Sequence, residues 1–214
     1  MKGVAIVGRK GGTGKTSIAH LLALGAAWRD VPAYLVHTDD REPITVIDRP
    51  YSYYDGRDPT ELERLTEVAS QHEGIFVLDG GGNRPDFDAW IAASMDLVLL
   101  PVCPDPEDVS LGLEHMATLE ERGATNVRFV VNKWPSSQHE RAYVRRWLHR
   151  LPFEKVVAAL PETKAVRILR ESDDAPFQTP PARVNNLSRS IYHLIGYNLG
   201  ELEKGRDTKA VQVA

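Results

Sequence analysis

Two lysines and three glycines lie within seven residues near the start of the chain. Residues 10 to 16 read Lys-Gly-Gly-Thr-Gly-Lys-Thr, and a serine follows. Glycines let a backbone turn tightly and direct several N–H groups inward, where they bind phosphate. A lysine after the last glycine reaches the β- and γ-phosphates of a nucleotide, and the next hydroxyl binds Mg²⁺. The stretch therefore predicts a phosphate-binding loop. Its residues are Lys10, Gly11, Gly12, Thr13, Gly14, Lys15, Thr16 and Ser17.

The residues on either side of this loop supply a strand and a helix. Residues 4 to 7 are apolar and partly β-branched, which is typical of a short buried strand. Ile18, Leu21 and Leu22 recur at the spacing of one helix face. This order places the partial positive charge of a helix N-terminus at the phosphate site. A glycine-rich turn with two solvated lysines is the alternative, and it leaves the flanking elements unexplained.

The loop departs from the standard pattern at its first positions. Arg9 stands where the usual loop has its first glycine, and Lys10 is an additional lysine directly before Gly11. Lys-Gly-Gly-Thr-Gly-Lys-Thr resembles the deviant Walker A box of the ParA/MinD family of ATPases. The resemblance implies ATP and Mg²⁺ as cofactors and a homodimer that forms on ATP binding. It also implies that Lys10 contacts the nucleotide of the other subunit, so that Lys10 and Lys15 both act in catalysis.

Two aspartates at strand ends match further motifs of that family. Asp79 follows the apolar run 75–78 and precedes three glycines, which resembles a Walker B carboxylate that holds a water of the Mg²⁺ shell. Asp39 matches the second aspartate of the family's Asp-x-Asp-Pro-Gln box, which positions the attacking water. The resemblance therefore implies Thr16, Asp39 and Asp79 at the metal, and Asp39 in catalysis. Simple turn caps are the alternative at both aspartates.

The same box holds the largest departure from the family pattern. His37 replaces its first aspartate, and Asp40 and Arg41 replace its proline and glutamine. A histidine near Mg²⁺ does not supply the same fixed negative charge, so the sequence leaves the rate of hydrolysis open.

Three later residues match the family's base-binding segments. Asn132 follows an apolar strand, and a side-chain amide donates to and accepts from a purine edge. The resemblance implies that Asn132 contacts adenine and that Pro161 and Glu162 line the other side of the base. Residues 101–108 resemble the family's Pro-x-x-Pro-Ser-Pro-x-Asp segment, which is expected to shape the dimer face. Cys103 is expected to be a small packed side chain there rather than a nucleophile, since no base is identifiable beside it.

Basic residues gather in two segments of the C-terminal half. A capping box predicts a helix that runs through residue 151, with arginines four and five apart, and three cations recur at three-residue spacing over 164–170. In the resembling ATPases, such residues bind DNA without reading its sequence, and only in the ATP-bound dimer. A solvated helix face is the alternative. The residues expected to contact DNA are Arg141, Arg145, Arg146, Lys164, Arg167 and Arg170.

Length and composition fit a single soluble domain. The chain has 214 residues, of which 42% are hydrophobic and 26% charged, and its formal net charge is −4. A chain with this charge binds nucleic acid only through a local basic patch. A single cysteine excludes an intrachain disulfide. No apolar run approaches the ~20 residues of a membrane span, so we expect a cytoplasmic protein without a membrane partner.

Strands and helices are predicted to alternate along the chain. Continuous apolar strands separated by helices predict an α/β fold with a doubly wound, mostly parallel sheet and helices on both faces. Residues 1–204 are expected to form one P-loop ATPase domain, with 43–57 as a surface loop and 205–214 as a polar, flexible tail. Predicted helices begin after the capping residues Asp58, Asp105 and Ser137, and later helical segments cover 164–171 and 186–203.

The sequence and its resemblance together indicate an ATP-dependent switch of the ParA type. Its ATP-bound dimer would bind nucleoid DNA and position a plasmid, chromosome or other cargo, and an adaptor of the ParB type would stimulate slow hydrolysis. Two alternatives stay open. One is a scaffold that dimerises with ATP but has lost hydrolysis; His37 in place of the family's aspartate is the reason for this alternative. The other is a small-molecule ligase or kinase on the same fold, for which no substrate motif is found.

Overall fold

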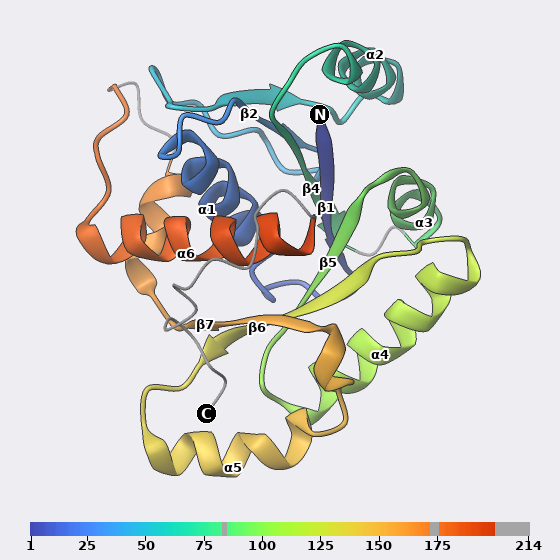
Figure 1. Cartoon of the computed structure of the whole chain (residues 1–214), viewed down its shortest axis with the longest axis vertical. Coiled ribbons are helices and arrows are strands. Elements are labelled where there is room, and N and C mark those ends of the chain that lie inside the picture. Colours follow the sequence, from blue (N-terminus) through green and yellow to red (C-terminus); the bar gives the residue numbers. More distant parts are fainter. Residues whose placement is uncertain (83–84, 172–175, 200–214) are drawn as a thin grey trace.

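Seven parallel strands form one sheet through the middle of the described structure (Figure 1). The structure, a computed structural model, describes residues 1–82, 85–171 and 176–199. The strand order is β3-β2-β4-β1-β5-β6-β7, and every pairing among these residues is parallel. The predicted α/β class with a doubly wound parallel sheet is confirmed. The strands are β1 (Lys2–Gly8), β2 (Ala33–His37), β3 (Ser52–Asp55), β4 (Ile75–Gly82), β5 (Leu97–Val102), β6 (Val127–Trp134) and β7 (Val156–Pro161).

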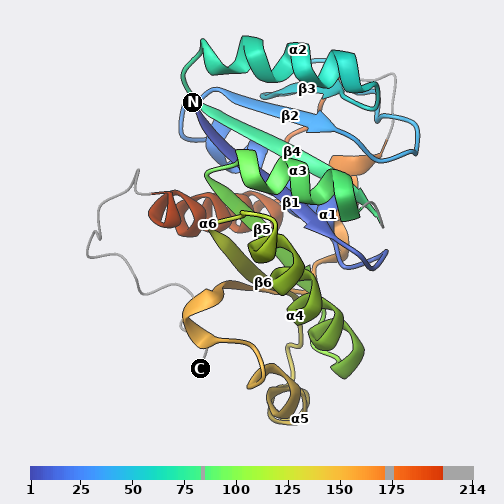
Figure 2. The same ribbon diagram turned by 90° about the vertical axis from the view of Figure 1, so that its right-hand side faces the viewer.

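Helices cover both faces of the sheet (Figures 1 and 2). One apolar layer joins the sheet to α1, α6 and the 3₁₀-helix η2, and a second layer joins it to α2, α3 and α4. α5 lies at the periphery and buries none of its residues. No helix in the described ranges is long and apolar enough to cross a membrane. The helices are α1 (Lys15–Ala27), α2 (Pro59–Ser70), α3 (Pro85–Ser94), α4 (Pro106–Glu121), α5 (Gln138–Leu148), η1 (Phe153–Lys155), η2 (Lys164–Arg170) and α6 (Ala182–Asn198).

Side-chain caps begin three of these helices, as the sequence predicts. The Asp58 carboxylate accepts hydrogen bonds from two N–H groups in the first turn of α2. The Asp105 carboxylate accepts from the N–H of Asp108, and the Ser137 hydroxyl accepts from the N–H of Glu140. Each bond satisfies an N–H group that the first turn of a helix leaves without a backbone partner.

The prediction of a loop over 43–57 is wrong in part, because β3 lies within it. Ser52–Asp55 pairs with β2 at the edge of the sheet, and Tyr54 is exposed. An edge strand that faces solvent needs no apolar run, so its composition gives little signal.

Other predicted bounds differ at their ends. α5 ends at Leu148 rather than at residue 151, and α6 covers Ala182–Asn198 rather than 186–203. The predicted tail 205–214 lies outside the described residues.

The topology gathers the predicted site at the carboxyl ends of the strands. The chain places β2, β3 and β4 on one side of β1 and then β5, β6 and β7 on the other. Ligands bind outside the carboxyl ends of the strands where the strand order reverses in this way. The phosphate loop follows β1 directly, and His37 at the end of β2 pairs in register with Asp79 of β4.

Candidate functional site

The loop between β1 and α1 has a backbone suited to hold phosphate. Gly12 and Gly14 have positive φ angles of 79° and 101°, which residues with a side chain rarely adopt. A Cβ at Gly14 would lie 2.1 Å from Nδ2 of Asn132, so this glycine also permits the close approach of β6. α1 begins at Lys15, immediately after the loop, and brings the free N–H groups of its first turn to the site.

Lys15 is buried at the start of α1, with 7% of its surface exposed. Its Nζ donates a 3.0 Å hydrogen bond to the carbonyl oxygen of Lys10. Burial lowers the pKa of Lys15, and the nearby carboxylate of Asp79 opposes that shift. No salt bridge joins Lys15 to a carboxylate of the described residues, so its ammonium group is available to an anionic ligand.

β6 supports the loop from the other side. The Asn132 amide donates a 2.8 Å hydrogen bond to the carbonyl oxygen of Thr13, and Nζ of Lys133 donates a 3.0 Å bond to that of Gly12. Sequence reasoning assigned Asn132 to the base and missed Lys133. The position of Lys133 next to Asn132 at a strand end was the signal that could have identified it.

Arg41 holds Asp39 at the site. The backbone N–H of Arg41 donates a 3.1 Å hydrogen bond to the Asp39 carboxylate, and the Arg41 guanidinium donates two of 3.0 Å. The Arg41 guanidinium lowers the pKa of Asp39 to about 2, so this carboxylate is ionised at neutral pH. The sequence did not predict this pair, because nothing in the order of residues shows that the side chain of Arg41 turns back onto Asp39.

Asp79 and His37 are buried together at the ends of β4 and β2. Nδ1 of His37 lies 3.7 Å from Oδ2 of Asp79, and neither oxygen of that carboxylate has a hydrogen-bond partner in the described part of the chain. Nε2 of His37 lies 2.9 Å from the carbonyl oxygen of Arg41. Burial lowers the pKa of His37, but Asp79 and the Arg41 carbonyl outweigh it, so the net pKa is raised.

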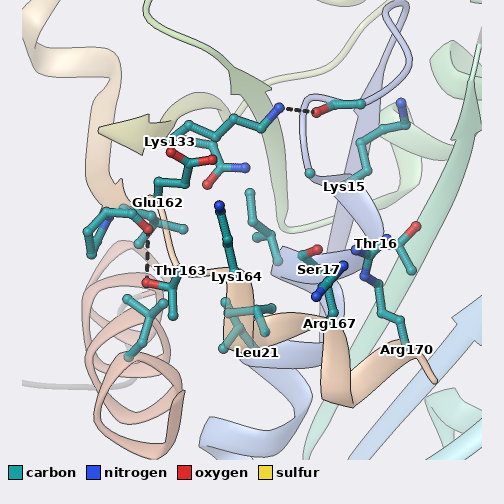
Figure 3. Close-up of a pocket in the computed structure, with 18 of the residues that line it drawn as sticks. Lys15, Thr16, Ser17, Leu21, Lys133, Glu162, Thr163, Lys164, Arg167 and Arg170 are labelled. Carbon is teal, nitrogen blue, oxygen red and sulfur yellow. Dashed lines mark hydrogen bonds between the residues drawn. The ribbon is translucent and has the colours of Figure 1, made fainter. Parts of the chain in front are cut away.

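A cavity of about 600 Å³ opens beside the phosphate loop (Figure 3). This volume lies within the range of about 300 to 1,000 Å³ that small-molecule sites occupy. The cavity brings together predicted residues from four parts of the chain. Those lining it are Gly11, Gly12, Gly14, Lys15, Thr16, Ser17, Asp39, Asn132, Pro161 and Glu162. Lys10, Thr13 and Asp79 are outside its lining.

Lys10 points away from this cavity and binds the start of α4. Its Nζ lies 2.6 Å from Oε2 of Glu107 and 2.6 Å from Oδ1 of Asp108. The hydrogen bond to Asp108, followed by that to Glu107, raises the pKa of Lys10. In this arrangement Lys10 contacts its own subunit, and a contact with another subunit's nucleotide requires both ion pairs to open.

The six cations predicted to bind DNA fall into two separate groups. Lys164, Arg167 and Arg170 line the cavity, beside the phosphate loop (Figure 3). The other three lie on α5. There, Nε of Arg141 donates to the carbonyl oxygen of Pro135, and the Arg146 guanidinium lies 3.6 Å above the Tyr143 ring. Arg145 is exposed.

The donors at this site suit Mg-ATP. The glycine backbone, the α1 N-terminus and Lys15 suit phosphate groups. The hydroxyl of Thr16 and the carboxylates of Asp39 and Asp79 are the hard oxygen ligands that Mg²⁺ prefers, directly or through water. The buried oxygens of Asp79, which accept no hydrogen bond from the described residues, are what a site that receives a cation would contain.

Comparison with known proteins identifies the fold. No protein-family model and no curated protein matches the sequence. Among solved structures, an McdA variant from Cyanothece in complex with ATP is 14% identical, with 95% of this chain and 98% of that chain covered and a TM-score of 0.65. MinD from Pyrococcus horikoshii, complexed with Mg-ADP, is 16% identical over 92% and 98% of the two chains, with a TM-score of 0.66.

A third match is a plasmid partition protein from Borrelia burgdorferi bound to AMPPNP. It is 12% identical over 91% of this chain and 98% of that chain, with a TM-score of 0.67. The chain therefore has the fold of the ParA and MinD ATPases over nearly its whole length. The resemblance drawn from the Walker A box is confirmed at the level of the fold.

Proposed function

We propose that the chain is a Mg-ATP-dependent dimerising ATPase of the ParA type. The observation that carries this proposal is the buried Lys15 at the start of α1, beside a cavity of about 600 Å³ that the glycine loop lines. When bound, Mg-ATP supplies the phosphoryl group and the charge that the site must balance. Lys15 then binds the β- and γ-phosphates, and Thr16, Asp39 and Asp79 hold the metal and its waters.

Two further residues extend the proposal to hydrolysis and dimerisation. Asp39 is ionised and lines the cavity, where it orients the attacking water. Lys10 leaves Glu107 and Asp108 and contacts the nucleotide of a second subunit. The three matched structures support this proposal, because one contains ATP, one Mg-ADP and one AMPPNP on the same fold.

The proposed cargo function rests on α5 and on a second protein. The ATP-bound dimer binds DNA without sequence preference through Arg141, Arg145 and Arg146, since dimerisation doubles this basic face. An adaptor of the ParB type stimulates hydrolysis and releases the DNA, in a cytoplasmic, nucleoid-associated cycle. The likeness to the Borrelia burgdorferi protein, which is assigned to plasmid partition, supports this proposal.

A scaffold without hydrolysis is the second candidate. Asp39 is bound in a bidentate pair by Arg41, and a histidine occupies the other position of its box. A carboxylate in such a pair has fewer free lone pairs with which to orient water. Steady-state phosphate release in the presence of DNA separates the two candidates, because the scaffold binds ATP and DNA without turnover.

The central test is nucleotide binding by Lys15→Ala. Loss of the ammonium leaves the phosphate charge uncompensated, so isothermal titration should detect no ATP binding. Lys155→Ala is the matched control, because Lys155 pairs with Glu120 and does not line the cavity. Wild-type ATP affinity in Lys15→Ala would contradict the assignment. For DNA, gel-shift assays should show retardation of random duplex with Mg-ATP at low salt and none without nucleotide.

A further inference from the structure

The three cations of η2 form one wall of the nucleotide cavity. η2 is a 3₁₀-helix, which has about three residues per turn and stacks residues three apart on one face. Lys164, Arg167 and Arg170 have this spacing, and all three line the cavity together with Lys15 and Thr16 (Figure 3). An α-helix has 3.6 residues per turn and would spread the same residues around its axis, so the 3₁₀ geometry is what aligns them.

The apolar residues of η2 pack against the protein core. Val166 and Leu169 are buried, with 7% and 0% of their surfaces exposed. Nη1 of Arg49 donates a 3.2 Å hydrogen bond to the carbonyl oxygen of Leu169 and a 2.7 Å bond to the hydroxyl of Tyr51. These contacts orient η2 with its three cations at the cavity.

Among the described residues, these cations have no partners of the kind that the other cations of the cavity have. Arg41 is paired with Asp39, and Lys133 binds the carbonyl oxygen of Gly12. In contrast, no salt bridge within residues 1–82, 85–171 and 176–199 involves the η2 cations. Nε of Arg170 is buried and has no hydrogen-bond partner in those ranges. Neighbouring cations repel one another, and an anion bound in the cavity offsets that repulsion.

We infer that the η2 face binds the phosphates of the nucleotide within its own subunit, alongside the phosphate loop (Figure 3). This inference rests on the proposed function and deepens it, because it assigns Lys164, Arg167 and Arg170 to the nucleotide rather than to DNA. Figure 3 places Arg167 and Arg170 beside Ser17 and Thr16, at the start of α1. A polyphosphate chain in a cavity sized for one nucleotide satisfies both the loop and these guanidinium groups.

The test is ADP binding to the full chain, measured by isothermal titration in low salt. The proposed dimer forms with ATP, and ADP lacks the γ-phosphate. The affinity for ADP therefore measures nucleotide binding by one subunit. Arg167→Gln and Arg170→Gln should each bind ADP about tenfold more weakly, since a hydrogen bond to a charged group has about that effect. Arg167→Lys and Arg170→Lys keep the charge and should recover part of the affinity. Lys164→Gln, at an exposed position, should weaken binding without risk to the fold.

Arg145→Gln on α5 is the matched control, because Arg145 is exposed and does not line the cavity. It should bind ADP like the wild type and lose part of its ATP-dependent DNA retardation. Wild-type ADP affinity in Arg167→Gln, Arg170→Gln and Lys164→Gln would overturn the inference. If DNA retardation were then lost, the η2 face would bind DNA at the cavity mouth. A wild-type chain that binds no nucleotide would instead contradict the proposed function.

Discussion

At the scale of single residues, His37 determines the charge beside Asp79. His37→Asp would bury a second carboxylate where Nδ1 now lies 3.7 Å from Oδ2 of Asp79. Two buried like charges destabilise the fold, so we expect a loss of roughly 3 kcal/mol of unfolding free energy without metal. Mg²⁺ should recover much of that loss, because it binds the folded carboxylate pair. Urea unfolding with and without Mg²⁺ measures both effects.

His37→Asn is the control for that substitution, because it removes the imidazole without adding a charge. We expect its stability to depend on Mg²⁺ no more than that of the wild type. An equal Mg²⁺ response in His37→Asp and His37→Asn would mean that position 37 does not contribute to a metal site. ATP turnover of His37→Asp should also differ from that of the wild type, since His37 lies two residues before Asp39.

Glu107 restrains Lys10 in the isolated subunit. Glu107→Gln removes one of the two ion pairs of Lys10 but leaves the buried Asp108 in place. A surface ion pair contributes about 0 to 1 kcal/mol, so the fold should keep its stability. If Lys10 acts across a dimer, its release becomes easier, and sedimentation with ATP should show dimers at up to about fivefold lower protein concentration.

Two other variants define the limits of this expectation. Glu114 lies 4.0 Å from Arg9 and does not pair with Lys10. Glu114→Gln should therefore dimerise like the wild type. Lys10→Ala should bind nucleotide and remain a monomer. A Glu107→Gln variant that dimerises more weakly than the wild type would show that Glu107 supports the dimer.

The loop residues could be predicted from the sequence because their spacing alone defines the motif. In the proposed site, Lys15 and Thr16 would reach phosphate and metal through local backbone geometry, which adjacent residues encode. The contacts of Arg41 and Lys133 arise instead from how a side chain folds back or how β6 meets the loop. No pattern of spacing records such contacts. For the same reason, the ion pairs of Lys10 with α4 could be found only in the structure.

At the scale of elements, α1, which begins at the phosphate loop, packs closely against α6. A Cβ at Gly25 of α1 would lie 2.1 Å from the backbone oxygen of Ser188 on α6. Gly25→Ala should therefore push the two helices apart and cost about 3 kcal/mol of unfolding free energy. Thermal unfolding measures this loss. Gly11→Ala is the control, because a Cβ there meets no atom within 4 Å, and it should unfold at the wild-type temperature.

Elements with an apolar face were predictable, and those that depend on their surroundings were not. Buried strands and capped helices carry their signals in composition and in residues such as Asp58 and Asp105. β3 is polar because it forms an edge, so it resembled a loop. η2 has the same residue types as an α-helix with a solvated basic face. Its 3₁₀ form and its place against the cavity follow from Val166 and Leu169 packing into the core.

At the scale of the whole molecule, two buried histidines make stability depend on pH. Burial lowers the pKa of His115 to about 4 and also lowers that of His20. Between pH 6.5 and pH 4 the unfolded chain therefore binds protons that the folded chain does not, and acid favours unfolding. We expect His115 alone to cost on the order of 3 kcal/mol by pH 4. Urea unfolding at a series of pH values measures the slope.

His115→Gln tests whether His115 causes the loss of stability at acid pH. This variant should lose part of the decline between pH 6.5 and pH 4, although the substitution also lowers stability at neutral pH. A decline identical to that of the wild type would assign the acid sensitivity to other groups, His20 among them.

The two residues that replace the usual loop start attach the loop to α4 at separate points. Lys10 binds the first turn of α4 through Glu107 and Asp108, and Nη2 of Arg9 binds the hydroxyl of Thr118 about three turns further along. The phosphate loop is thus tied to both ends of α4, a helix that Val109 and Leu119 anchor in the core. If Lys10 leaves Glu107 and Asp108 in an ATP-bound dimer, those two carboxylates lose their ion pairs, while the Arg9 contact keeps the loop attached near the other end of the helix. The start of α4 would then present negative charge that is neutralised in the single subunit.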